Sequence, residues 1–107
     1  MLKKPPKILR EKPVLESTVK IAVKKRLKEL GAFHHWPVQL GFGDRCLDCH
    51  GCYQGHYFSI ETKAPGKVPT TIQNHTIANI RAVGGTVLII DSEEKANAIT
   101  SDHLQGK

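Results

Sequence analysis

The sequence predicts an α/β domain in which helices flank a small mixed sheet. Three observations lead to this prediction. Apolar residues recur at helical spacing over 14–30, two strand-like runs flank the Gln54-Gly55 pair, and residues 86–90 are β-branched or aliphatic throughout. With one more strand before the hairpin and a helix after it, the order is helix, three strands, helix, strand. The 107 residues fit one domain with one modest core.

The first helix is predicted over 14–30. Its apolar stripe, spaced by three and four residues, consists of Leu15, Val19, Val23, Leu27 and Leu30. Gly31 follows where a left-handed C-cap is expected, and Glu16 stands in the first turn, where an acid suits the helix dipole. Another face carries a lysine row at i, i+4 spacing, namely Lys20, Lys24 and Lys28. The row is expected to be a solvated face, with contact to a DNA backbone as the alternative.

Three strands are predicted to follow. Residues 33–39 form a short strand at a sheet edge, because Pro37 cannot donate a backbone hydrogen bond. The next two, 49–53 and 56–63, form a hairpin around a two-residue Gln54-Gly55 loop. In this register Tyr53 faces His56, and the numbers of opposed residues sum to 109.

The two faces of the hairpin differ in character, since side chains alternate along a strand. One face is apolar and is predicted to pack on a helix; it carries Cys49, Tyr53, Phe58 and Ile60. The other face is polar and carries Asp48, His50, Ser59, Glu61 and Lys63. A strand pair of this kind has one face that packs in the core and one face that is available for chemistry.

The second helix is expected to start at a cap, Thr70 or Thr71, and to end at Gly84-Gly85. Its predicted apolar face consists of Ile72, Thr76, Ile80 and Val83. The run 86–90 is predicted to be a strand buried on both faces. Asp91-Ser92 can cap a short helix that begins at Glu93-Glu94, after which the polar tail is expected to fray.

The charge of the chain indicates an anionic partner. Sixteen Lys and Arg against ten Asp and Glu give a formal net charge of +6, an excess typical of nucleic-acid-binding proteins. Residues 1–13 are interpreted as a basic arm and 14–107 as a single domain. No signal-peptide core and no apolar run of about 20 residues is found, so a cytoplasmic location is expected.

The best candidate for chemistry is a pair of acids on the hairpin. Asp48 is predicted to face Glu61, and like charges placed opposite each other on neighbouring strands repel. A cation between them would remove that penalty, and Mg²⁺-type ions prefer such oxygen ligands. The main-chain carbonyl of Thr62 can reach the same ion, and Lys63 lies on the face of Glu61. These parts suit phosphodiester hydrolysis. Asp44 is the alternative acid, but the same register places it opposite position 65, off the strand.

A structural zinc site is the second candidate. Three cysteines at intervals of three residues stand among several histidines: Cys46, Cys49, Cys52, His34, His35, His50 and His56. Zinc is often bound through Cys-x₂-Cys pairs, and the odd number of cysteines argues against a disulfide framework. On a regular strand, however, Cys49 and Cys52 point to opposite faces, so one ion cannot easily bind both.

Several of these residues together form a known pattern. They are Asp48, Gly51-Cys52-Tyr53-x-Gly55, Phe58-x-Ile60-Glu61-Thr62-Lys63-Ala64-Pro65-Gly66-Lys67, Thr70 with Thr71 and Gln73, and Ala82-x-Gly84-Gly85. The pattern resembles the PD-(D/E)XK nuclease superfamily, and within it small phage-type VRR-NUC (virus-type replication-repair nuclease) domains. The resemblance covers roughly residues 14–92. Leu47 departs from it, because the motif usually has a proline before the aspartate.

The resemblance implies a restriction-endonuclease-like αβββαβ core and a Mg²⁺- or Mn²⁺-dependent deoxyribonuclease. The implied metal ligands are Asp48, Glu61, the Thr62 carbonyl and Glu16 on the first helix. Lys63 would serve the attacking water, and Gln73 would lie beside the site at the start of the second helix. The implied enzyme is a homodimeric, structure-selective endonuclease on branched DNA, similar to Holliday junction resolvases, and would act in the host cytoplasm if phage-encoded.

Two further functions remain open at this point. One is a restriction-type or exonucleolytic activity on the same fold. The other is a non-catalytic basic module that binds nucleic acid and is held together by a Cys/His zinc site.

Overall fold

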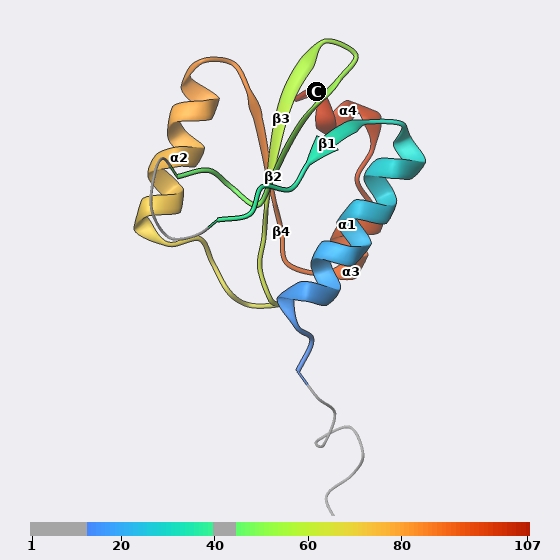
Figure 1. Ribbon diagram of the computed structural model, residues 1–107, viewed down its shortest axis with the longest axis vertical. Helices are drawn as coiled ribbons and strands as arrows, with labels where there is room; N and C mark the ends of the chain where they lie inside the picture. The colour runs from blue at the N-terminus through green and yellow to red at the C-terminus, as the bar shows by residue number, and fades with distance from the viewer. Residues whose placement is uncertain (1–12, 40–44) are drawn as a thin grey trace, which may run out of the picture.

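A four-stranded mixed sheet divides the molecule into two layers in the computed structural model, which describes residues 13–39 and 45–107 (Figure 1). Strands β1 (Phe33–His35), β2 (Cys49–Tyr53), β3 (His56–Thr62) and β4 (Thr86–Ile90) follow one another across the sheet. The first three run antiparallel, whereas β4 pairs parallel to β3. The predicted α/β class with a mixed sheet is therefore confirmed.

The hairpin has the predicted register. Tyr53 pairs with His56 and Cys49 with Ile60, and Gln54 and Gly55 form the turn at φ 48° and 80°. Two consecutive residues at positive φ match the twist of the flanking strands. β3 ends at Thr62, one residue earlier than expected.

Helices α1 (Glu16–Leu30), α3 (Glu93–Asn97) and α4 (Ser101–Leu104) cover one face of the sheet, here called the core face (Figure 1). The buried residues in this layer are Val19, Ala22, Val23, Leu27, Cys49, Phe58, Ile60, Ile90, Ala96, Ile99 and Leu104. Helix α1 starts two residues later than predicted, because Leu15 has extended backbone and is exposed. Gly31 ends it at φ 73° as predicted, with its N–H donating to Leu27 and Lys28 carbonyls.

Helix α2 (Thr71–Ala82) covers part of the opposite face, here called the site face (Figure 1). Thr70 caps it, and the small core beneath consists of Leu47, Ile77 and Val87, with Ile80 partly buried. The predicted apolar face of this helix is wrong in part, since Ile80 packs on the small core as expected whereas Ile72 and Val83 are exposed. Ile77 and Ile80 form a competing stripe on the adjacent helix face, and Val87 and Leu47 pack against that stripe.

Burial at the end of the chain also differs from the prediction. β4 is an edge strand, so Ile89 is partly exposed and the prediction of burial on both faces is wrong. Ser92 caps α3 as expected. The tail does not fray there, because Ile99 and Leu104 are buried against the core face and Thr100 caps α4.

Some predictions lie outside the described residues. These are the basic arm apart from its last residue and the alternative acid Asp44. β1 is shorter than predicted and ends before Trp36-Pro37, where the proline cannot donate to a ladder. In the part of the chain that is described, no helix has both the length and the apolar character to cross a bilayer.

Candidate active site

Asp48 and Glu61 meet at the end of the hairpin, as its register predicts. Asp48 directly precedes β2, and its backbone N–H donates to Glu61 Oε1 at 3.2 Å. The Asp48 carboxylate is anchored in turn, since Oδ2 accepts from the Thr62 N–H at 2.9 Å and from Thr62 Oγ1 at 2.8 Å. The two carboxylates are thus held by backbone and hydroxyl groups on neighbouring strands.

Each carboxylate also faces an ammonium group. Lys63 Nζ lies 3.5 Å from Glu61 Oε2, with the lysine side chain 13% exposed and the glutamate side chain 2%. From helix α1, Lys20 Nζ lies 3.6 Å from Asp48 Oδ1 and 3.8 Å from Glu16 Oε2. The charged side chains expected at the site therefore lie in two groups of ion pairs, Lys63 with Glu61 and Lys20 with Asp48 and Glu16. The hydrogen bond from the Asp48 N–H to Glu61 joins the two groups.

Lys20 is the site residue that sequence reasoning missed. The lysine row on α1 was interpreted as a solvated face, whereas Lys20 contacts Asp48 and links it to Glu16. A signal was present in its spacing, because a lysine four residues after an acid lies beside that acid on a helix. Once Glu16 is assigned to the site, the lysine four residues after it is therefore also expected at the site.

The electrostatics of the pair favour a bound cation. The pKa of Glu61 is raised to about 7, first by burial and next by the neighbouring Asp48 charge, and the Asp48 N–H and Lys63 only partly offset these effects. A buried carboxylate beside another carboxylate resists ionisation. Additional positive charge would be needed to keep both ionised at neutral pH.

The donor set fits a Mg²⁺-type ion with two protein carboxylates. Such ions bind one or two carboxylates and take their other ligands from water and substrate phosphate. Because the N–H and C=O groups of a strand residue point to the same neighbouring strand, the Thr62 carbonyl lies on the Asp48 side as well. Within 13–39 and 45–107 no cluster of three or more His, Cys, Asp or Glu side chains could hold a metal. Glu16 is accordingly linked to the pair through Lys20 rather than directly.

Gln73 is placed differently from the acids. Its side chain closes a capping box, with Oε1 accepting from the Thr70 N–H at 2.9 Å and its own N–H donating to Thr70 Oγ1. It also lines a cavity of about 310 Å³ together with Leu47, the residue before Asp48. Gln73 therefore caps helix α2, and it shares a cavity with the chain neighbour of Asp48 rather than contacting the acid pair itself.

The cysteines do not converge. Cys49 is buried on the core face, whereas Cys46 and Cys52 are exposed, and all three are free thiols. Burial, more than any other cause, raises the pKa of the Cys49 thiol to about 12, which disfavours the thiolate that zinc requires. Cys49 and Cys52 are separated by the sheet, as strand alternation predicts.

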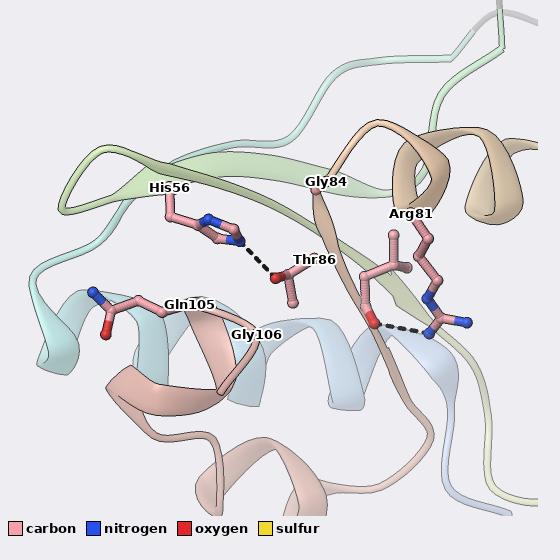
Figure 2. A pocket seen from close by; sticks show the side chains of 8 residues that line it. His56, Arg81, Gly84, Thr86, Gln105 and Gly106 are labelled. Atoms are coloured by element: carbon pink, nitrogen blue, oxygen red, sulfur yellow. Dashed lines mark hydrogen bonds between the residues drawn. The ribbon is translucent and has the colours of Figure 1, made fainter.

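A second hollow, of about 350 Å³, lies at the other end of β3 and β4 (Figure 2). Its polar groups are already paired. His56 Nε2 lies 2.7 Å from Thr86 Oγ1, and Arg81 Nη2 donates to the Val87 carbonyl at 3.0 Å. These contacts tie the start of β3 to β4 and the end of α2 to the sheet edge.

Comparison of the chain with protein-family models gives no match, and comparison with curated proteins gives none either.

Proposed function

We propose that this protein is a metal-dependent DNA endonuclease of the PD-(D/E)XK type. The observation that carries the proposal is the Asp48–Glu61–Lys63 arrangement, two anchored carboxylates and a mostly buried lysine side chain at one end of a hairpin. The element order also supports a restriction-endonuclease-like αβββαβ core, since a helix precedes three antiparallel strands and a second helix leads to a parallel fourth. The short α3 and α4 then extend this core.

The residues have distinct roles in the proposed reaction. Asp48, Glu61 and the Thr62 carbonyl would hold Mg²⁺ or Mn²⁺, and the ion would supply activation of a water and neutralisation of charge on the phosphoryl group. Lys63, held beside Glu61, orients the attacking water and donates to phosphate oxygens. The water oxygen bonds to phosphorus, one P–O ester bond breaks, and the departing oxygen takes up a proton. Glu16 acts at the rim of the site through Lys20.

The proposed substrate is branched DNA, and the proposed active form is a homodimer. A net charge of +6 favours a polyanion, and the ammonium of Lys20 lies at the site with Lys24 one helical turn further along α1. Phosphate contacts of this kind recognise shape rather than sequence. Two sites related by a two-fold axis would cut two strands of a junction symmetrically.

The test compares cleavage of four-way, flap, nicked and linear DNA in Mn²⁺. Paired symmetric cuts in the four-way substrate are expected, and Lys63→Ala or Glu61→Gln should lower the rate by roughly 10²–10³-fold or more while DNA binding survives. Lys25→Ala, on the exposed side of α1, serves as the matched lysine control. Undiminished cutting by either site variant would end the assignment, and degradation from DNA ends would replace the resolvase-like activity with an exonuclease.

One observation favours a second candidate, a non-catalytic nucleic-acid-binding module. Lys20 and Lys63 already provide counter-charges for the two carboxylates, and no three-ligand metal cluster is found among the described residues. This candidate predicts binding that weakens steeply with salt and no cleavage in Mg²⁺ or Mn²⁺.

A further inference from the structure

A row of rings crosses the site face beside the acid pair. Across β1, β2 and β3, His35 pairs with His50, and Phe33 pairs with Cys52, which pairs with Tyr57. Paired residues point to the same face and residues two apart share it, so these side chains lie on the face of Glu61. Phe33, His35, His50 and Tyr57 are here called the ring face.

Three of the rings, those of His35, His50 and Tyr57, follow one another across the sheet, and Phe33 lies on the same face of β1. The His35 and His50 centroids are 5.4 Å apart at 76°, and those of His50 and Tyr57 are 6.2 Å apart at 31°. Phe33 is 68% exposed and Tyr57 is 44% exposed. Helix α2 packs against β4 and buries Val87, at the other side of the same face. Among the described residues, the small core under α2 includes none of these four rings.

The Tyr57 ring is held in place at one edge. A Cβ atom added to Gly85 would lie 3.0 Å from Tyr57 Cδ1, so the ring rests against the backbone at the start of β4. The opposite side of the ring approaches His50. A ring that is positioned but nearly half exposed loses little freedom when a flat ligand stacks on it.

Positive charge lies across the β1 edge from the ring face, on helix α1 of the core face. Lys24 Nζ lies 4.9 Å from the centre of the Trp36 ring, directly after β1. Burial, and then the charges of Lys28 and Lys24, lower the pKa of His34 in the same strand. None of the four ring-face residues is acidic. A phosphate backbone that passes the β1 edge would meet these lysines, and the formal net charge of +6 favours a polyanion.

We propose that the ring face stacks unpaired bases of single-stranded DNA and delivers an unpaired segment of the substrate to Asp48 and Glu61. His50 is two residues along the chain from Asp48, which directly precedes β2, a separation of roughly 7 Å, so a base stacked on His50 places its neighbouring phosphate near the acid pair. Exposed aromatic rings on a sheet beside basic residues are a general means of binding unpaired bases. The inference rests on the proposed function, since it specifies which part of the DNA substrate enters the site.

The experiment measures binding of a short labelled single strand and of the matching duplex by fluorescence anisotropy, in EDTA so that no cleavage occurs. Phe33→Ser and Tyr57→Ser should each weaken single-strand binding roughly tenfold and duplex binding less than twofold. Phe33→Tyr should retain binding because it keeps a ring. Val83→Ser removes an 87% exposed apolar side chain away from the ring face and serves as the control. Equal losses on both DNA forms, or none, would overturn the proposal.

A second measurement does not depend on how the Phe33 and Tyr57 variants fold. Cys52 is exposed and lies between Phe33 and Tyr57 in the strand register, so a bulky maleimide on Cys52 should block single-strand binding. The label is placed there in a Cys46→Ser background, and a label introduced by Val83→Cys in a Cys46→Ser, Cys52→Ser background is the control. Unhindered single-strand binding by the Cys52-labelled protein would contradict the proposal that the ring face binds single-stranded DNA.

Cleavage assays separate this inference from the proposed function. If the protein binds single strands through the rings but cuts no DNA in Mn²⁺, the endonuclease assignment fails and the ring face stands. If the protein cuts DNA while the ring variants bind single strands normally, the ring face fails and the endonuclease assignment stands.

Discussion

The two faces of the sheet differ in what they bury. The core face packs three helices over an apolar cluster that includes Phe58 and Ile60. The site face has one helix over a small cluster, and its other fully buried side chains include Ser59 and Glu61. Ser59 and Glu61 alternate with Phe58 and Ile60 along the same strand, so one strand serves both faces.

The difference shows how a small domain can hold a buried charge. Desolvating a carboxylate costs free energy, and a chain of this size has only a modest total stability to offset that cost. Concentrating the apolar burial on the core face supplies the stability, and the site face then carries Glu61 with its pKa raised. Changes on the core face should therefore destabilise the fold, whereas neutralising Glu61 should stabilise it.

The largest expected effect is on the core face. Phe58→Ala removes a fully buried ring and should lower the free energy of unfolding by about 3–5 kcal/mol. Tyr57→Ala changes the next residue, which points to the other face, and should cost about 1 kcal/mol. Urea unfolding followed by circular dichroism measures both, and equal losses would contradict the division between the faces.

The next effect is a dependence of stability on pH. The pKa of Glu61 is raised to about 7, so the folded protein keeps a proton that the unfolded chain loses from about pH 4.5 upward. Stability should therefore fall as pH rises from about 4.5 to 7, by about 2–3 kcal/mol in the absence of divalent metal. Urea unfolding from pH 5 to 8, compared with Glu61→Gln, isolates this group. If the free energy of unfolding changed with pH in the same way in both proteins, the raised pKa of Glu61 would not be the cause of the pH dependence.

At pH 8 Glu61→Gln should be more stable than the unsubstituted protein by about 1–2 kcal/mol. The amide keeps the acceptor for the Asp48 N–H and removes a buried negative charge beside Asp48. Loss of the Lys63 contact limits the gain. Thermal denaturation in EDTA measures the change, and a lower melting temperature for the variant would show that the Lys63 pair outweighs the burial cost.

The smallest effect concerns Lys20. Its side chain is 36% exposed and 3.6 Å from Asp48, so Lys20→Gln should change stability by less than about 1 kcal/mol. The same change removes a cation that competes for Asp48 and should tighten Mn²⁺ binding a few-fold by calorimetry. Lys25→Gln alters an exposed lysine on the same helix and is the control. Weaker Mn²⁺ binding by Lys20→Gln alone would show that Lys20 supports the metal site.

Local signals predicted most of the fold. Gly31, the Gln54-Gly55 turn, Thr70 and Ser92 each act through backbone geometry or a cap within a few residues, and each lies where it was expected. The register that sets Asp48 beside Glu61 follows from the turn alone, because a two-residue loop leaves one pairing. The acid pair was therefore predictable without knowledge of the rest of the chain.

Features that depend on tertiary packing were not predictable in this way. The side of α2 that is buried depends on where Val87 and Leu47 lie, and Ile80 belongs to both possible stripes. The polar composition of the tail gave no indication that Ile99 and Leu104 would dock on the core face. The contact of Lys20 with Asp48 joins a helix to a hairpin, and only the packing of α1 on the sheet establishes it.

The hairpin has a consequence for the order of folding. Asp48 and Glu61 belong to one local hairpin, which can close in about 1–10 μs, whereas β3 meets β4 only after the crossover through α2. The two acids are thus brought together before the helices exclude water from them, while their repulsion is still weakened by solvent. Folding is expected to slow at high pH at the later step, when the parallel strand docks and α2 closes over the charged side of the sheet.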